Sequence, residues 1–164
     1  SKGLTGAKLS LVTSNNQLRA QIAEIMQAQL KEIGLDISVQ TLEWGAFLTA
    51  TGNGDLDMFM MGWGPSTYDG DYGLYPNFHS SQFGTNGNRT FYSNPKVDEL
   101  LDNAKKEMDV EKRRAMYTEV INIINEDAPV LPLNYSNTII GVSNNLEGVK
   151  PTSYPLFYKY SFKK

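Results

Sequence analysis

The sequence contains no cysteine and only one histidine, His79, among its 164 residues. The absence of cysteine excludes disulfide bonds, thiol catalysis and thiolate metal sites. A lone imidazole lacks the partners that a metal centre or a catalytic triad needs. We therefore expect His79 to be an ordinary loop residue and the chain to hold no metal.

The chain also lacks a long hydrophobic run, a basic excess and a phosphate-binding loop. No window approaches the roughly 20 apolar residues that a membrane-spanning helix needs. The formal net charge of −3 argues against a nucleic-acid partner. Without a Gly-Lys-Ser/Thr motif we expect no nucleotide cofactor, and indeed predict no cofactor of any kind. The length fits one domain, although a chain that starts at Ser1 suggests a piece of a longer protein.

The first 42 residues predict a β-α-β unit. Residues 7–13 alternate weakly, as a strand does, and 18–33 carry apolar residues at helical spacing up to Gly34. Residues 35–42 alternate with a period of two and are rich in β-branched side chains. Such a unit places its two strands in parallel, joined by a right-handed crossover.

The rest of the chain continues this α/β pattern. Helices are predicted over 43–51, from Asn94-Pro95 onward and after the capping residue Asp109. Strands are predicted over 58–61, 130–135 and 139–142, and the run 157–162 also alternates. The apolar run 58–61 is typical of a central strand that is buried on both faces. The predicted fold is therefore a mixed, mainly parallel sheet flanked by helices.

A polar and aromatic loop follows the predicted strand 58–61. Ligands bind outside the carboxyl ends of strands in α/β sheets, so this loop is the candidate site. The candidate ligand-binding residues are Trp63, Gly64, Ser66, Thr67, Tyr68, Asp69, Asp71 and Tyr72. Aromatic walls with a few polar groups are typical of a small-molecule or peptide pocket. The alternative is an ordinary surface loop that carries two acids for solubility.

The two acids of this loop leave two functions open. Asp69 and Asp71, on either side of Gly70, could act as the acid and base of a secreted carbohydrate-active hydrolase. They could also bind a cationic ligand without any chemistry. Asp71 is the preferred partner of an ammonium group, because Gly70 and Gly73 let the backbone turn sharply beside it. Asp69 could instead cap a short helix that follows it.

Three groups of residues resemble the bacterial family of extracellular solute-binding proteins for peptides and nickel complexes, family 5. The first group is Glu43-Trp44, Gly54-Asp55-Leu56-Asp57-Met58-Phe59 and Gly62-Trp63. The second is Phe91-Tyr92-Ser93-Asn94-Pro95-Lys96-Val97-Asp98-Glu99-Leu100-Leu101. The third is Arg114, Tyr117, Ile124, Glu126-Asp127-Ala128-Pro129 and Pro132-Leu133. These matches keep the family's order and spacing over nearly the whole chain.

The resemblance implies a fold and a function for the chain. The fold would be the second lobe of a type II periplasmic binding protein, with residues 1–137 as the lobe and 138–164 as a segment that returns to a missing first lobe. The protein would not be an enzyme but the substrate-binding component of a bacterial ABC importer. We expect it outside the cytoplasm, as part of a longer, lipid-anchored protein that delivers solute to a membrane permease.

The resemblance leaves the ligand open. Oligopeptides, dipeptides and glutathione are the expected solutes, and nickel complexes or haem are alternatives within the family. General peptide binders of this family carry an aspartate three residues after the tryptophan, where it pairs with the peptide's amino terminus. Here that position is Ser66, and the segment Gly62–Leu74 looks more like the glutathione-binding branch.

Overall fold

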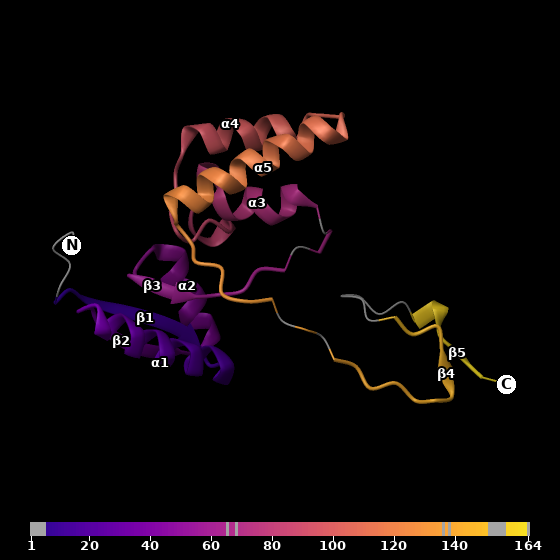
Figure 1. The fold of residues 1–164 in the computed structure, drawn as a ribbon, viewed down its shortest axis with the longest axis horizontal. Coiled ribbons are helices and arrows are strands. Elements are labelled where there is room, and N and C mark those ends of the chain that lie inside the picture. The colour runs from indigo at the N-terminus through magenta and orange to yellow at the C-terminus, as the bar shows by residue number, and fades with distance from the viewer. Residues whose placement is uncertain are drawn as a thin grey trace. The chain divides into compact units, whose positions relative to one another are not determined.

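The structure is a computed structural model that describes residues 6–64, 66–67, 69–135, 137, 139–150 and 157–163. The chain divides into two compact units, Ser1–Val130 and Leu131–Lys164. The first unit contains a parallel sheet with its helices and a separate group of three helices (Figure 1). The second unit contains a short antiparallel pair of strands.

The predicted β-α-β unit is confirmed. It consists of β1 (Lys8–Ser14), α1 (Gln17–Glu32) and β2 (Asp36–Leu42), with the two strands paired in parallel from Lys8↔Asp36 to Ser14↔Leu42. The side chain of Asn16 caps α1 by accepting the Arg19 N–H at 3.0 Å. The order of strand, helix and strand thus gives the parallel pair that was predicted from the sequence.

The prediction of a central, fully buried strand at 58–61 is wrong in its position. Among the described residues, strand β3 (Met58–Met60) pairs in parallel with β1 alone, so the sheet order is β2-β1-β3 and β1 is the middle strand. Met60 is buried, whereas Met58 and Phe59 are half-buried. An apolar run marks burial but does not say which strand has neighbours on both sides. That position belongs to β1, where Leu11 to Ser14 are all buried.

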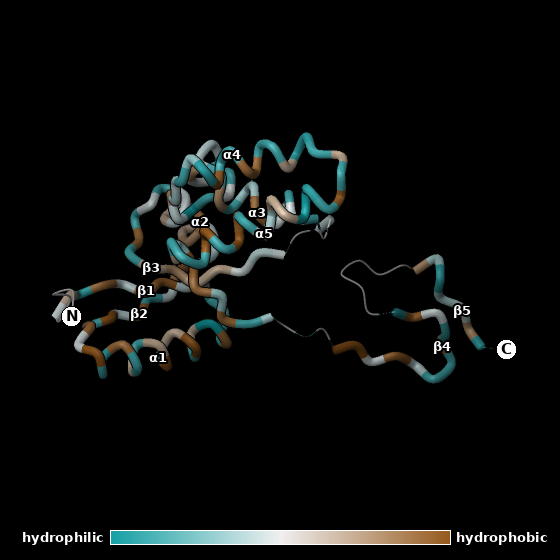
Figure 2. Tube along the Cα trace, turned by 45° about the horizontal axis from the view of Figure 1, so that its top comes forward, coloured by the Kyte–Doolittle hydropathy of each residue, from teal (hydrophilic) through white to brown (hydrophobic). Residues whose placement is uncertain are grey.

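Helices α1 and α2 (Trp44–Asn53) cover opposite faces of this sheet. On the α1 face, Leu11, Ala23, Ile37 and Met60 form one hydrophobic cluster. Figure 2 shows why α1 can do this, because apolar and polar residues alternate along its turns. On the other face, Phe47 of α2 is fully buried and meets the ring of Phe59 edge-on at 6.3 Å.

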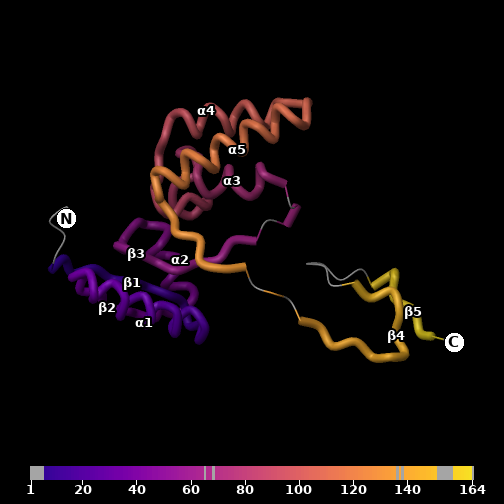
Figure 3. Tube along the Cα trace, in the orientation of Figure 1, coloured from indigo at the N-terminus to yellow at the C-terminus, as the bar shows by residue number. Residues whose placement is uncertain are grey.

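Three further helices form a second core within the first unit. They are α3 (Gly70–Phe78), α4 (Pro95–Ala104) and α5 (Val110–Asp127), and Figure 3 lets the reader follow the chain through them. The predicted caps of α4 and α5, Asn94 and Asp109, are confirmed. Apolar residues of α4 and α5 form the core, which consists of Val97, Leu100, Leu101, Val120 and Ile124. Two short 3₁₀ turns, η1 (Ser80–Gln82) and η2 (Gly84–Asn86), link α3 to α4.

The second unit contradicts two predicted strands. Neither 130–135 nor 139–142 lies in a strand, as far as their described residues go. Leu131, Tyr135 and Ile139 are 71%, 97% and 93% exposed, so their side chains are not buried as those of a packed strand would be. The described strands of this unit are β4 (Leu146–Glu147) and β5 (Ser161–Phe162). The 3₁₀ turn η3 (Phe157–Lys159) lies between them in the sequence, just before β5. In the described parts of both units, no helix has the length and apolarity required to span a membrane.

Candidate ligand-binding site

The loop between β3 and α3 begins at the carboxyl edge of the parallel sheet. Strands β1 and β3 end side by side, with Thr13 opposite Met60 in the register. The amino end of α1 begins beside them, three residues after Ser14. This is the edge at which α/β sheets bind their ligands, as the sequence predicted.

Trp63 and Tyr72 close the two ends of this loop onto each other. The indole N–H of Trp63 donates a hydrogen bond to the backbone carbonyl of Tyr72 at 3.1 Å. Their ring centroids lie 5.6 Å apart, with the planes tilted by 48°. The side chains stay 47% and 41% exposed, so the pair offers an aromatic surface to a ligand instead of filling the core.

Asp69 has a structural task at the start of α3. Its Oδ1 accepts the backbone N–H of Asp71 at 2.8 Å, which makes it the N-cap of the helix. The same oxygen accepts a hydrogen bond from Arg113 at 2.6 Å. The Asp71 N–H is the main cause of a lowered pKa for the Asp69 carboxyl; burial opposes it, and Arg113 adds a smaller lowering effect. The interpretation of Asp69 as a helix cap is thus confirmed.

Asp71 differs from Asp69, because one of its oxygens is unsatisfied. It lies in the first turn of α3, and its Oδ1 is buried without a hydrogen-bond partner among the described residues. Buried polar atoms in folded proteins almost always have such a partner. A buried carboxylate oxygen that lacks one still needs a hydrogen-bond donor or a cationic group to satisfy it.

The other candidate residues lie on the exposed part of the loop. Gly64, Ser66 and Thr67 are all exposed, and no atom would crowd a Cβ placed on Gly64. The hydroxyl of Thr67 accepts the N–H of Asp69 at 3.4 Å. Tyr68 lies outside the described residues. The structure thus brings Trp63 and Tyr72 together and leaves Gly64, Ser66 and Thr67 open to solvent.

Arg19 reaches this loop from the first turn of α1 and was missed in the sequence. Its Nη1 donates a long hydrogen bond of 3.4 Å to the Ser14 hydroxyl at the end of β1. Its Nη2 lies so close to the backbone of Gly62 that a Cβ there would be 3.0 Å away. No described carboxylate approaches this guanidinium within the 4.0 Å of an ion pair. One signal could have revealed it, because a cation near a helix N-terminus opposes the helix dipole.

Arg113 and Tyr117 of α5 were also missed, since they follow the loop by more than 40 residues. Arg113 bonds Asp69 and, at 3.3 Å, the Tyr117 hydroxyl. The Tyr117 ring lies under Gly70, where a Cβ would come within 2.7 Å of its Cδ2 atom. Both residues occupy ordinary periodic positions of an amphipathic helix, so their spacing did not indicate a role beside the loop.

His79 follows α3 in a loop, as predicted, but it is buried to 7% exposure. Its ring stacks on Tyr75, with 4.3 Å between the ring centroids. Its Nδ1 accepts the Ser81 N–H at 3.0 Å, and its buried Nε2 lies 3.5 Å from Asp102 Oδ1 without a hydrogen-bond partner among the described residues. The residue therefore has a packing role. Among the described residues no three His, Cys, Asp or Glu side chains are grouped to hold a metal ion.

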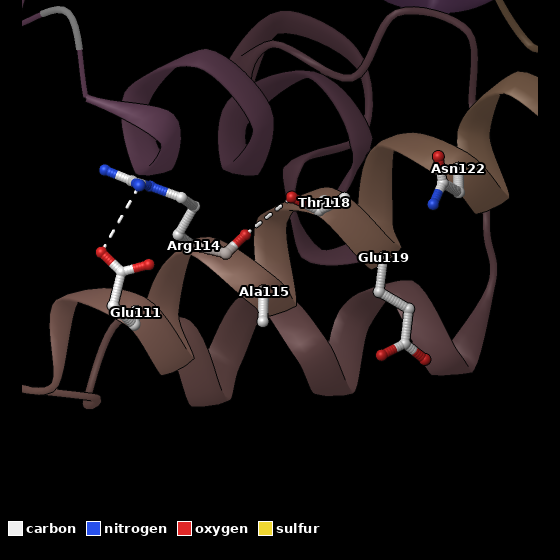
Figure 4. A pocket seen from close by; sticks show the side chains of 6 residues that line it. All are labelled: Glu111, Arg114, Ala115, Thr118, Glu119 and Asn122. Atoms are coloured by element: carbon white, nitrogen blue, oxygen red, sulfur yellow. Dashed lines mark hydrogen bonds and ion pairs between the residues drawn. The ribbon is translucent and has the colours of Figure 1, made fainter.

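Two surface hollows lie apart from the loop. Figure 4 shows one of them, whose six labelled residues all come from α5, with Arg114 bonded to Glu111. The other lies near the amino ends of the strands, beside Asp57. The Asp57 carboxylate accepts the N–H and the hydroxyl of Ser10, each at 2.8 Å, and these bonds lower its pKa. Neither hollow contains a residue of the candidate loop.

Comparison with known proteins places this geometry in a class. The chain is 35% identical over 150 residues to the oligopeptide-binding protein AppA of Bacillus subtilis, covering 88% of this chain and 27% of that protein. It is 31% identical over 150 residues to the glutathione-binding protein GsiB of Shigella dysenteriae, covering 87% and 29%. Among solved structures, the periplasmic binding protein DppA from Helicobacter pylori, in complex with the peptide STSA, superposes with a TM-score of 0.82 at 31% identity. That match covers 98% of this chain and 32% of the other.

The fold is thus that of a periplasmic binding protein, of which the chain spans less than a third of the length in these relatives. The profile of one family, described as bacterial extracellular solute-binding proteins, family 5, middle region, matches residues 2–85. The chain belongs to this family.

Proposed function

We propose that this chain is the second ligand-binding lobe of a substrate-binding protein that serves a bacterial ABC importer for peptides or peptide-like solutes. The proposal follows from the family and from relatives that are named for oligopeptides and glutathione. In this reading the protein captures solute outside the cytoplasm and delivers it to a membrane permease. It carries out no chemistry on the solute. A lipid-anchored parent and a first lobe that meets residues 138–164 complete the proposed assembly.

The observation that carries the proposal is the unsatisfied carboxylate oxygen of Asp71 beside an exposed aromatic pair. A peptide's ammonium group needs a partner when it leaves water, and Asp71 offers one. The rings of Trp63 and Tyr72 supply apolar surface for a side chain of the peptide. Arg19, at the other end of the loop, offers a positive charge to a carboxylate of the same ligand.

The alternative of a carbohydrate-active hydrolase loses its support at Asp69. A glycosidase needs two carboxyl groups that face one substrate in a closed pocket. Asp69 is instead engaged by a helix N-terminus and by Arg113, and the loop beside it is exposed. No observation on the described residues favours a haem or a nickel complex over a peptide.

Selection from a peptide mixture tests the proposal. A longer protein that joins this chain to a first lobe is incubated with equal amounts of random tetrapeptides whose amino termini are either free or acetylated, and retained peptides are identified by mass spectrometry. We expect retention of peptides with free amino termini in preference to acetylated ones. Retention of no peptide at all would contradict the proposed function. Retention without any preference would leave a peptide binder in which Asp71 does not recognise the ammonium.

A further inference from the structure

Arg113 and Tyr117 lie in the amino-terminal half of α5 and contact the start of α3. We call these two residues the seat of α3. We propose that Arg113 and Tyr117 are positioning residues that act through Asp69 and Gly70 to hold Asp71 in place for a cationic group of the ligand. This inference rests on the proposed function. It adds two residues that influence ligand specificity although they follow the loop by more than 40 positions in the sequence.

The first contact of the seat is a shared oxygen. Asp69 Oδ1 accepts the N–H of Asp71 at 2.8 Å and the guanidinium of Arg113 at 2.6 Å. The carboxylate that orients the backbone of Asp71 is therefore itself held by α5. If Arg113 is removed, Asp69 can rotate, and the first turn of α3 loses the bond that fixes it to the neighbouring helix.

The second contact is close packing between Gly70 and the ring of Tyr117. A Cβ at Gly70 would lie 2.7 Å from Tyr117 Cδ2, nearer than real side-chain contacts allow, so the glycine lets the backbone rest on the ring. The Arg113 guanidinium also bonds the Tyr117 hydroxyl at 3.3 Å. Arg113 and Tyr117 thus form one surface against which the residues before and after Gly70 are placed.

The charges around Tyr117 agree with this geometry. Its pKa is raised, mainly by burial, while Arg113 lowers it and the carboxylates of Asp71 and Asp69 raise it. Both carboxylates therefore act electrostatically on the phenol. The seat combines one positive charge, which is bonded to Asp69, with the unsatisfied oxygen of Asp71 nearby.

The ion pair of Arg113 with Asp69 contributes little to the stability of the fold. The core between α4 and α5 is formed by other residues, against which the Tyr117 ring also packs, but Arg113 takes no part in it. The side chains of Arg113 and Asp69 are 33% and 40% exposed, and ion pairs in such positions stabilise proteins only weakly. Loss of Arg113 should therefore change the placement of Asp71 more than it changes folding.

The test compares Arg113→Gln with the wild type, both made in the longer protein with a first lobe, in the same mixture of free and acetylated tetrapeptides. We expect the ratio of free to acetylated peptide retained to fall by about fivefold, the factor that corresponds to a partly exposed ion pair. Retention of acetylated peptide should not change, because it makes no use of Asp71. Arg113→Lys keeps the charge and should restore part of the ratio. Tyr117→Ala should lower it as Arg113→Gln does.

Arg114→Gln is the matched control, since Arg114 is the next residue of α5 and pairs only with Glu111 among the described carboxylates. It should leave the ratio at the wild-type value. An unchanged ratio in Arg113→Gln would overturn the inference while the proposed function stands. An equal loss of both peptide forms would also overturn it, because it would indicate a purely structural role. Failure of the wild type to retain any peptide would remove the proposed function and this inference together.

Discussion

The guanidinium of Arg19 lies against the backbone of Gly62, where the chain leaves the sheet and enters the candidate loop. Its one hydrogen bond there, to Ser14, is 3.4 Å long, so most of its donors face no described acceptor. A planar guanidinium with free donors suits a carboxylate, which it can bind through two parallel bonds. Together with Asp71, it gives the loop opposite charges at its two ends.

Arg19→Gln should therefore reduce the preference of the chain for peptides with a free carboxyl terminus. Hydrogen bonds to charged groups contribute about 1.5–3 kcal/mol, which corresponds to about a tenfold to hundredfold change in affinity. The measurement is the ratio of tetrapeptides to their carboxyl-terminal amides retained by each variant. Lys31→Gln removes the same charge from the exposed far end of α1 and should change nothing. Equal ratios in wild type and Arg19→Gln would show that the carboxylate is bound elsewhere.

Asp71 and Asp69 should respond to substitution in opposite ways. Removing one member of a buried charge pair costs about 3–5 kcal/mol, so Asp71→Asn should weaken peptide binding by at least about a hundredfold. Its thermal stability should stay near that of the wild type, because Oδ1 bonds no described group. Binding by Asp71→Asn at the wild-type level would mean that the ligand has no ammonium or holds it elsewhere.

Asp69→Ala should mainly lower stability, because it removes the N-cap of α3. Loss of such a cap costs about 1 kcal/mol, and the half-exposed ion pair with Arg113 adds less than about 1 kcal/mol. Because Arg113 acts through Asp69, the effect of Asp69→Ala on binding should be similar to that of Arg113→Gln and much smaller than that of Asp71→Asn. Denaturant unfolding and peptide retention, measured on the same preparations, separate the two carboxylates.

Local patterns in the sequence predicted most of the first unit. The caps Asn94 and Asp109 and the alternation of Asp36–Leu42 are properties of neighbouring residues, so they were visible without a structure. The edge position of β3 was not, because it depends on which strands pair. The strands expected at 130–135 and 139–142 failed for the same reason, since β propensity forms a strand only where a partner strand exists.

The candidate site, too, could be predicted only where local sequence patterns mark it. The loop itself was predicted, because a buried strand that opens into glycines, acids and aromatics is a local signal. Arg113 contacts Asp69 although it lies 44 residues further along the chain, and the spacing of residues within the loop does not predict this contact. Asp69 could be assigned to a cap from its position before Gly70, whereas the unsatisfied oxygen of Asp71 required atomic positions.

The hydrogen bond between Tyr92 and Asp127, 2.6 Å long, should make stability depend on pH at both ends of the scale. Burial, reinforced by Asp127, raises the pKa of Tyr92 to about 12, and the bonds from Tyr92 and Asn94 lower the pKa of Asp127. The unfolded chain loses the tyrosine proton near pH 10, before the folded chain does. Tyr92 thus contributes stability below pH 10 that is lost as the pH rises towards 12.

At the acid end the sign is reversed. Asp127 binds a proton more readily in the unfolded chain, so its contribution is present above its unfolded pKa of 3.8 and is lost as the pH falls through the lower folded value. Tyr92→Phe should flatten both limbs of a plot of unfolding free energy against pH. Tyr158→Phe, at a residue that is 80% exposed, is the control. A Tyr92→Phe curve parallel to that of the wild type would show that the bond has no linkage to protons.

The second unit should be less protected than the sheet. Phe157, Tyr158 and Phe162 are 71%, 80% and 78% exposed, and β4 and β5 contribute only two residues each. Few buried contacts imply local opening at low free energy. Amide hydrogen exchange should therefore be faster in residues 157–163 than in β1. Equal protection of both in a monomeric chain would contradict the proposal that this unit packs on a first lobe.

The proposed lobe arrangement makes a prediction about affinity. The loop from Trp63 to Thr67 is exposed in its described residues, and the two surface hollows described above lie elsewhere. A solute on this loop would stay largely in water, whereas binding sites normally bury 70–90% or so of a ligand's surface, often by closure of one domain on another. A longer protein that joins this chain to a first lobe should therefore bind the same tetrapeptide at least about a hundredfold more tightly, a gain of about 3 kcal/mol.

Isothermal calorimetry on the two proteins, with the tetrapeptide retained most strongly in the selection, measures this difference. Asp71→Asn made in both proteins is the control, and it should weaken binding in each. Equal affinities for the wild-type pair would mean that the whole site lies within these 164 residues, and the reading of the chain as one lobe of a closing pair would then fail.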